Sequence, residues 1–298
     1  NMCSASTKSR RRVGIVGYGH LVYPSTGEYL VRELQREGGA HGLELAFVWN
    51  RSAERMQGNV EPDQQLRDLE RFAERRADLI VEVSHPNISR DFGEMFLQHA
   101  DYLVGSPTAL ADAATERRLR EASATHGRTL YVPAGAFWGG DDIQKMADRG
   151  TLKALTVTMT KHPASFKLEG ALRQANAQAL AEGAGAGRRV LYEGPVRHLC
   201  PLAPNNVNTM AAAAMAAHNL GFDGVTGRLV ADSVPSLPDW HIVEIEVRGV
   251  GDPPFSVTTT RRNPALPGAV TGNATYASFL SSLLGCCRLF FQLGVHVA

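Results

Sequence analysis

The chain has 298 residues with 31 basic and 30 acidic side chains, which give a formal net charge of +1. This balance excludes a protein that holds nucleic acid or an acidic membrane surface through its overall charge. Hydrophobic residues make up 44% of the chain and charged residues 20%, so a disordered chain is excluded as well. At about 150 residues per domain, the length indicates one large domain or two smaller ones.

The first 133 residues alternate between short apolar runs and amphipathic patterns. Strands are expected at 13–16, 43–49, 79–83, 102–104 and 129–132, and helices at 28–37, 66–76, 88–98 and 109–126. Buried strands that alternate with helices are typical of a doubly wound parallel sheet. Residues 1–133 are therefore predicted to form an α/β dinucleotide-binding domain of the Rossmann type.

The pattern changes after residue 133. Residues 152–161 alternate apolar and threonine side chains, which predicts a strand with one buried face. Further strands are expected at 228–232, 240–249 and 254–260, and helices at 141–149, 174–187, 206–220 and 275–291. We predict an α+β catalytic domain with a mostly antiparallel sheet over residues 134–265. The C-terminal helix, within 266–298, is expected to return to the first domain.

Cysteine usage and the chain termini bear on the compartment. The four cysteines are Cys3, Cys200, Cys286 and Cys287. They form no Cys-x-x-Cys pair and no metal-ligand spacing, so we expect free thiols in the cytoplasm and no metal site. Residues 1–12 are polar and basic, unlike a signal peptide. The most apolar stretch, 279–297, is interrupted by Arg288, so no membrane span is expected.

A glycine turn follows the first strand. Gly17 would permit a tight turn, and Gly19 would let the backbone approach a pyrophosphate at a helix N-terminus. The third glycine of the usual fingerprint would fall at Val22, so the motif is broken. Residues 23–27 look like an insertion, with Gly27 taking the helix-packing role later. We interpret this segment as dinucleotide-binding; a tight turn that holds no ligand is the alternative.

The residues after the second strand bear on the choice of cofactor. An acidic residue there would bind the ribose 2′-hydroxyl of NAD. The chain has Asn50, which does not repel a 2′-phosphate, and Arg51, which could pair with one. The cofactor is thus predicted to be NAD or NADP, with a hint of NADP. Arg51 as a solvated loop residue is the alternative.

Several short motifs follow one another along nearly the whole chain. They are Gly105–Asp112, Pro133–Asp142, Tyr192–Pro195, Ala203–Ala212, Asp239–Gly249 and Asn263-Pro264. In this order they resemble the L-aspartate dehydrogenase family. The resemblance is greatest in Pro-x-Asn-x-Asn before a helix of small residues, and in Asp-x-His-x-x-Glu-Ile-x-x-x-Gly.

The resemblance implies NAD(P)-dependent oxidative deamination of L-aspartate to iminoaspartate, carried out by a homodimer. It matches His241 to the family's catalytic histidine. Ala136 and one of Asn206 and Asn208 match its cofactor-contacting positions. The chain departs from the family in the inserted glycine loop and in Ala134, where a serine is usual.

The residues themselves are compatible with these roles. His241 shares one side of its strand with three aliphatic residues, and partial desolvation favours a neutral imidazole that can act as a base. A satisfied core histidine is the alternative. Asp239 could orient the imidazole or belong to a turn. Lys161 and His162 end a strand, where they could meet a substrate carboxylate or solvent.

The asparagines at the start of the helix at 206–220 offer amides, which can bind a carboxamide or a carboxylate. Asn205 or Asn206 is expected to cap the helix, which leaves Asn208 as the better candidate for a ligand contact. Two other functions stay open for the whole chain. One is a homoserine-dehydrogenase-like or other amino-acid or hydroxy-acid dehydrogenase, and the other is a non-enzymatic dinucleotide sensor.

Overall fold

The first sheet is parallel, and the glycine turn lies where the carboxyl ends of its strands meet. A computed structural model describes residues 10–19, 25–234 and 240–288. In this part of the chain the strand order is β3-β2-β1-β4-β5-β6, with every neighbouring pair parallel. The strands are β1 (Arg11–Val16), β2 (Leu43–Trp49), β3 (Gln65–Leu66), β4 (Leu79–Glu82), β5 (Asp101–Val104) and β6 (Leu130–Tyr131). The predicted doubly wound parallel sheet is confirmed.

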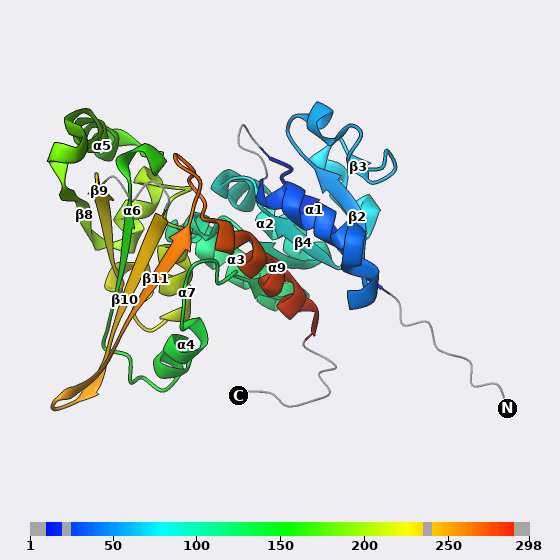
Figure 1. Ribbon diagram of the computed structural model, residues 1–298. Coiled ribbons are helices and arrows are strands. Elements are labelled where there is room, and N and C mark those ends of the chain that lie inside the picture. Colours follow the sequence, from blue (N-terminus) through cyan, green and yellow to red (C-terminus); the bar gives the residue numbers. More distant parts are fainter. Residues whose placement is uncertain (1–9, 20–24, 235–239, 289–298) are drawn as a thin grey trace.

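Helices cover both faces of this sheet (Figure 1). They are α1 (Thr26–Glu37) and α9 (Asn273–Arg288) on one face, and α2 (Pro86–His99) and α3 (Ala113–His126) on the other. Leu30 of α1 and Phe279 of α9 pack in one core with Val13 and Ile15 of β1. The chain order reverses between β1 and β4, and in such sheets the carboxyl ends at the reversal form the ligand crevice.

The second sheet is mostly antiparallel, as predicted. Its strand order is β11-β10-β7-β9-β8, and β7 with β9 is the parallel pair. The strands are β7 (Ala154–Lys161), β8 (Arg188–Pro195), β9 (Thr226–Asp232), β10 (Trp240–Gly251) and β11 (Pro254–Pro264). Figure 1 shows the β10–β11 hairpin projecting beyond the rest of this sheet.

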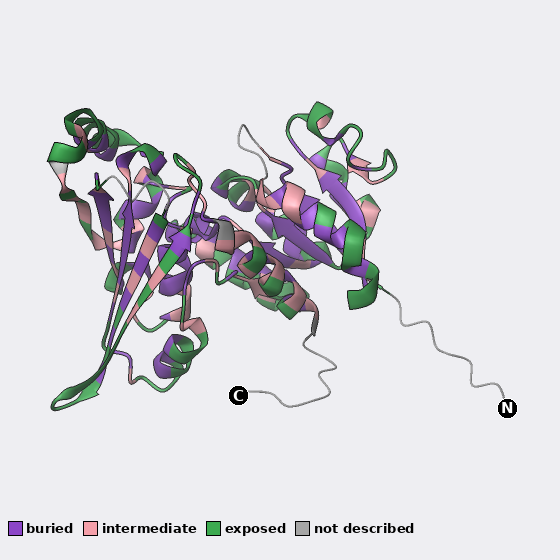
Figure 2. Ribbon diagram, viewed as in Figure 1, coloured by how far each residue is buried: buried purple, intermediate pink, exposed green. Residues whose placement is uncertain are grey.

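One face of the second sheet is buried against short helices. The helices of this lobe are α4 (Gly140–Asp148), α5 (Gly170–Glu182), α6 (Val196–Leu199), α7 (Asn208–Ala216) and α8 (Gly221–Gly224). A Cβ on Gly227 of β9 would lie 2.9 Å from the sulfur of Met210 in α7, so the helix approaches the sheet closely there. Val157 and Ile245 share this core, which continues into the α2–α3 side of the first sheet. Figure 2 shows β9 largely buried and the tip of the β10–β11 hairpin exposed.

The prediction of an α-helix at residues 66–76 is wrong. Residues 65–66 form the edge strand β3, and Leu69–Arg75 form a 3₁₀-helix that Asp68 caps through the Glu70 N–H at 3.0 Å. Leu69 and Phe72 are both buried. Their spacing of three residues suits a 3₁₀-helix, in which such side chains eclipse, as well as it suits an α-helix.

The alanine-rich helix is shorter than expected. It ends at Ala216, and after a turn α8 begins at Gly221. Asn219 donates its side-chain amide to the Leu152 carbonyl at 2.9 Å, and His218 pairs with Asp148 at 2.7 Å. These side chains are bound to other elements, and such contacts favour leaving the helix. The helix expected at 109–126 is likewise interrupted, because Asp112 caps α3 through the Thr115 N–H at 3.0 Å.

Two strand predictions also need correction. Strand β8 was not expected, because as an edge strand it alternates between exposed and half-buried residues and lacks an apolar face. Strand β7 was expected to bury one face, yet Thr158 and Thr160 are each only 2% exposed. The strand lies at the centre of the sheet, and Arg228 of β9 reaches across to the Thr158 hydroxyl at 3.4 Å.

Among the described residues, no helix combines the length and apolar character needed to cross a membrane.

Candidate functional site

Three glycines shape the turn after β1. Gly17 and Gly19 have φ of +115° and +109°, in the region that favours glycine. A Cβ on Gly27 would lie 2.0 Å from the Gly17 carbonyl oxygen, so α1 packs directly on the turn there. Gly27 therefore performs the close packing that a third glycine performs in a dinucleotide fingerprint.

Asn50 supports the same turn. Its Oδ1 accepts the Tyr18 backbone N–H at 3.0 Å, and its Nδ2 donates to the Ser52 carbonyl at 3.0 Å. The buried amide is thus engaged at both ends. The exposed Arg51 lies next to it. Burial lowers the pKa of His85, and the positive charges of Arg90 and Arg51 lower it further. Arg51 therefore places a positive charge near His85, whose lowered pKa favours the neutral imidazole.

A buried carboxyl lies near the carboxyl ends of the strands of the first sheet. It was not predicted from the sequence. Glu82 ends β4 and is fully buried. It accepts the backbone N–H groups of Ser84 at 2.6 Å and Ser106 at 2.9 Å, and the Ser106 hydroxyl at 3.1 Å. Burial raises its pKa to about 7 despite these bonds. Glu82 joins the turns that follow β4 and β5, which border the predicted crevice.

The helix end that should face a pyrophosphate is closed by a capping box. Ser25 accepts the Glu28 N–H at 3.2 Å, and the Glu28 carboxylate accepts the Ser25 N–H at 2.8 Å. A Cβ on Gly19 would lie 3.3 Å from Cδ of Glu28. The glycines fit a dinucleotide, whereas a carboxylate at this position opposes a second anion. Residues 20–24, which include the first two residues of the insertion, lie outside the described part of the chain.

On the second sheet, three polar side chains form one row across neighbouring strands. His241 of β10 pairs with Asn263 of β11, and the Ile242–Thr160 pair places Lys161 of β7 opposite His241 on the other side. Directly opposed residues point to the same face of a sheet. The row lies on the same face as Val243 and Met159, which belong to the shared core. We call Lys161, His241 and Asn263 the polar row.

The imidazole of His241 has one bound and one free nitrogen. The Ala269 backbone hydrogen-bonds the ring, whereas the buried Nε2 has no partner in the described residues. A Cβ on Gly272 would lie 3.7 Å from Nδ1, so Nδ1 faces the 269–272 segment. A carbonyl there fixes the proton on Nδ1 and leaves the Nε2 lone pair free. Burial and the nearby Lys161 lower the pKa of His241 to about 3.

Lys161 is buried rather than solvated. It is 2% exposed, donates to the Val270 carbonyl at 2.9 Å, and lies 5.7 Å from the centroid of the Phe166 ring. Burial lowers the pKa of its ammonium to about 7. His162, by contrast, turns its ring to the Ala164 N–H at 3.2 Å as a local cap. Asp239 lies outside the described residues.

The other candidate residues lie where the two lobes meet. Ala136 is buried in a turn whose Gly135 carbonyl accepts Arg261 of β11 at 3.1 Å and Ser278 of α9 at 2.7 Å. Pro204 accepts the Thr108 hydroxyl of the first lobe at 2.9 Å. These bonds bring the 134–136 turn and the asparagine segment to the carboxyl edge of the first sheet.

The asparagines do not cap α7. Its N-cap is Val207, which makes no side-chain bond, so the prediction of an asparagine cap is wrong. Asn206 instead donates to the Lys167 carbonyl at 2.6 Å. Buried Oδ1 atoms of both Asn206 and Asn208 lack partners among the described residues. Each is therefore an acceptor without a donor, as a position that receives a ligand would be.

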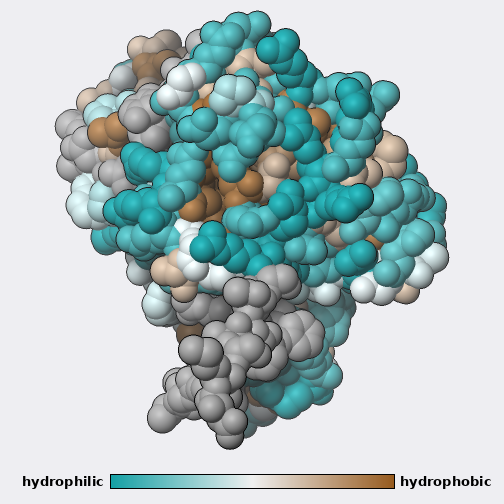
Figure 3. Space-filling view, turned by 90° about the vertical axis from the view of Figure 1, so that its right-hand side faces the viewer, coloured by the Kyte–Doolittle hydropathy of each residue, from teal (hydrophilic) through white to brown (hydrophobic). Residues whose placement is uncertain are grey.

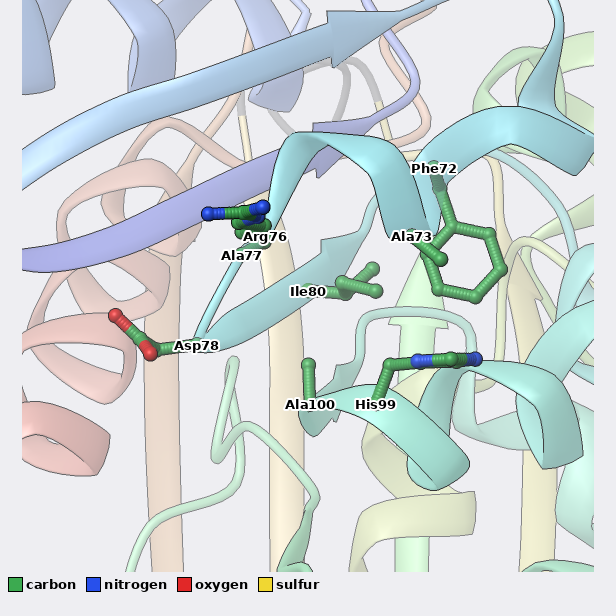
Figure 4. A pocket seen from close by; sticks show the side chains of 8 residues that line it. All are labelled: Phe72, Ala73, Arg76, Ala77, Asp78, Ile80, His99 and Ala100. Atoms are coloured by element: carbon green, nitrogen blue, oxygen red, sulfur yellow. The ribbon is translucent and has the colours of Figure 1, made fainter.

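A cavity of about 250 Å³ lies away from these residues. Phe72, Arg76, Asp78 and His99 are among the residues that line it (Figure 4). It sits where β4 begins, and ligands of such sheets bind at the ends where strands finish. The cavity is therefore not the dinucleotide crevice.

The family described as "Aspartate dehydrogenase, C-terminal" matches residues 142–282. An aspartate dehydrogenase domain-containing protein of Xenopus tropicalis is 61% identical over 94% of this chain and 96% of its own length. The chain belongs to the aspartate dehydrogenase family. It is thus a member of an oxidoreductase family, and the suspected resemblance is confirmed.

More distant relatives agree. The L-aspartate dehydrogenase of Archaeoglobus fulgidus is 28% identical over 80% of this chain and 82% of its own length. The crystal structure of aspartate dehydrogenase from Thermotoga maritima has a TM-score of 0.67 and 18% identity, and the match covers 96% of this chain and 100% of that one. This likeness shows the same fold.

The first lobe matches a second family, "Homoserine dehydrogenase, NAD binding domain", over residues 25–133. This match supports a pyridine nucleotide as cofactor. It begins after Gly17 and Gly19, downstream of residues 20–24. The match therefore begins within the insertion at residues 23–27.

Deleting residues 22–26 should tighten dinucleotide binding. The deletion gives Gly-Tyr-Gly-His-Leu-Gly, which restores the fingerprint spacing, and it removes the Ser25 cap. Freed N–H groups at a helix N-terminus stabilise a phosphate by about 1 kcal/mol or more, so we expect Kd to fall about fivefold to tenfold. Quenching of protein fluorescence by NADH and NADPH measures Kd. An unchanged or weaker affinity would show that the insertion does not hinder the cofactor.

Proposed function

We propose that the chain catalyses the NAD(P)-dependent oxidative deamination of L-aspartate to iminoaspartate, which water then converts to oxaloacetate and ammonia. The observation that carries this proposal is the free, buried Nε2 of His241, held between Lys161 and Asn263. The names of the relatives support the choice of substrate.

The residues present fit an acid–base role for His241. When bound, the nicotinamide supplies the acceptor for the hydride that leaves Cα of the substrate. Nε2 takes a proton from the substrate ammonium, so that the nitrogen lone pair can form the imine as the C–H bond breaks. Once it has released this proton to solvent, the same nitrogen can accept a proton from the water that adds to the imine carbon. The Ala269 carbonyl keeps the other ring nitrogen protonated throughout.

The free protein holds His241 in a weakly basic state, and the substrate changes this. With a pKa of about 3, the imidazole is neutral at pH 7. The positive charge of Lys161 is the second largest cause of that depression, after burial. A substrate carboxylate beside Lys161 would compensate this charge and raise the pKa of His241. Binding of the acid substrate therefore strengthens the base that acts on it.

We also propose that the chain accepts NADP at least as well as NAD. Asn50 is occupied by the turn, and no carboxylate stands at the end of β2 to bind a ribose 2′-hydroxyl. Arg51 and His85 offer positive charge and a donor to a 2′-phosphate instead. The free thiols Cys200, Cys286 and Cys287 support a reducing compartment, which we take to be the cytoplasm.

Replacing His241 tests the acid–base role. We expect His241→Asn to lower kcat with L-aspartate by about 100-fold or more, because general acid–base catalysis contributes roughly that factor. Binding of NADPH should change by less than twofold. The measurement is absorbance at 340 nm, with His198→Asn, an exposed histidine of α6, as the control. Turnover that survives in His241→Asn contradicts the assignment.

Replacing Arg51 tests the cofactor preference. Loss of a charged hydrogen bond to the 2′-phosphate costs about 1.5–3 kcal/mol, so Arg51→Ala should raise the KM for NADP at least about tenfold and leave that for NAD unchanged. Arg55→Ala removes an exposed cation nearby and serves as the control. Equal effects of Arg51→Ala on both cofactors would remove Arg51 from the 2′-phosphate site.

We propose a homodimer that covers the β10–β11 hairpin. The tip of this hairpin is exposed (Figure 2). Its Phe255 is 53% exposed, and Val250 and Val257 are exposed as well. The face of the first lobe in Figure 3 is mostly hydrophilic by comparison. Light scattering should give twice the chain mass of 32.2 kDa. Phe255→Asp should give a monomer, whereas Leu180→Asp on α5, also exposed, should not. A monomeric unmodified protein refutes the proposal.

A further inference from the structure

Two cationic side chains on the His241 face have no carboxylate partner among the described residues. The Lys161 ammonium donates to the Val270 carbonyl at 2.9 Å. The Arg261 guanidinium donates to the Gly135 carbonyl at 3.1 Å through one of its five N–H groups. A carbonyl dipole only partly replaces the hydration of a full charge, so burial lowers the pKa of Lys161 to about 7 and also lowers that of Arg261.

Register places both cations beside His241. Lys161 opposes His241 directly on β7. Arg261 pairs with Val243, two residues along from the His241–Asn263 pair on the same face. Two residues of a strand span about 6.6 Å, and an arginine side chain covers that distance. Lys161 therefore lies across the sheet from the imidazole, and Arg261 lies on the same face of the sheet, on β11 and two residues along from Asn263.

The polar row also contains acceptors without donors. The Nε2 of His241 and the Oδ1 of Asn263 are both buried and unpartnered in the described residues, although the two residues are only 5% and 2% exposed. Asn263 uses its Nδ2 on the His241 carbonyl at 3.3 Å, which fixes Oδ1 as the free end of the amide. Buried acceptors of this kind are rare unless a donor reaches them.

Together the unsatisfied groups describe the missing ligand. The cations can bind carboxylates, and the acceptors can bind an ammonium group. We propose that Lys161 and Arg261 each bind one carboxylate of a short 2-amino dicarboxylic acid, whose ammonium donates to His241 Nε2 and Asn263 Oδ1. This assignment rests on the proposed function and identifies Lys161, Arg261 and Asn263 as the residues that select the substrate.

The arrangement explains why a dicarboxylate is preferred to a monocarboxylate. An amino acid with one carboxylate leaves one desolvated cation without a counter-charge, and a site built for a polar group rejects a ligand that lacks it. The amide of Asn263 is neutral, so it receives an ammonium without repelling the carboxylates as an acidic side chain would. Lys161 and Arg261 hold the substrate, while the proton transfer belongs to His241.

Four variants and one control test this assignment. Lys161→Met and Arg261→Met remove one cation each while keeping an apolar stem. Arg262→Met is the control, because Arg262 pairs with Ile242 on the opposite face of β11 and is exposed. Asn263→Ala removes the ammonium acceptor. Arg261→Lys keeps the charge and should restore part of the binding.

Binding is measured apart from turnover. The ligands are L-aspartate and succinate, which has two carboxylates and no ammonium, and the readout is the ligand-induced rise in Tm with NADPH present. We expect Lys161→Met and Arg261→Met to weaken both ligands by at least about tenfold, since charged hydrogen bonds contribute about 1.5–3 kcal/mol each. Asn263→Ala should weaken L-aspartate and leave succinate unchanged. Arg262→Met should bind both as the unmodified protein does. NADPH affinity, measured by fluorescence, reports whether each variant is folded.

The outcomes separate this inference from the proposed reaction. If the protein oxidises L-aspartate while Lys161→Met and Arg261→Met keep its KM, the residue assignment is wrong and the reaction stands. If L-aspartate is not oxidised, yet both variants lose succinate and Arg262→Met keeps it, the dicarboxylate site stands and the reaction is wrong. Loss of succinate in Asn263→Ala as well would contradict the ammonium role of Asn263.

Discussion

The site depends on the register of β10 between β7 and β11. Because side chains alternate along a strand, a slip of one residue would turn His241 and its neighbours to the opposite face. Val243 and Ile245, which are buried on the His241 face, hold the register against such a slip. Each aliphatic side chain contributes about 1.5–3 kcal/mol when fully buried, so the hydrophobic core fixes the chemistry of the polar row.

The C-terminal segment connects this row to the first lobe. Ala269 and Val270 contact His241 and Lys161 through the backbone, and α9 begins a few residues later. Phe279 of α9 is packed in the core of the first sheet, and Ser278 binds the 134–136 turn. The segment therefore touches the proposed acid–base residue, a proposed substrate-binding cation and the turn at the cofactor side. A shift of α9 on the first sheet would therefore change the backbone contact at Nδ1 of His241.

The sequence predicts the parts of the molecule that local pattern controls. Buried strands and the small-residue motifs were enough for the class of both sheets and for the family, but not for the edge strands β3 and β8. Arg261 and Asn263 were missed because their role arises from pairing with a strand that is remote in the sequence. Glu82 was missed because a carboxyl within an apolar run gives no sign of its three donors. The prediction for residues 66–76 failed because their apolar spacing does not distinguish a 3₁₀-helix from an α-helix.

The two ends of the proposed site carry opposite charges: cations at the substrate end and a carboxylate at the cofactor end. At the proposed substrate end, Lys161 and Arg261 have no carboxylate partner among the described residues. Binding the two carboxylates of a substrate would therefore recover part of the free energy that burial of these charges costs. The cofactor end holds Glu28 at the start of α1, where a pyrophosphate would sit. A net charge of +1 conceals this division. If the proposed site is correct, affinity for the dinucleotide depends on the arrangement of a few residues after Gly19, whereas the second sheet already holds the groups proposed to bind the substrate.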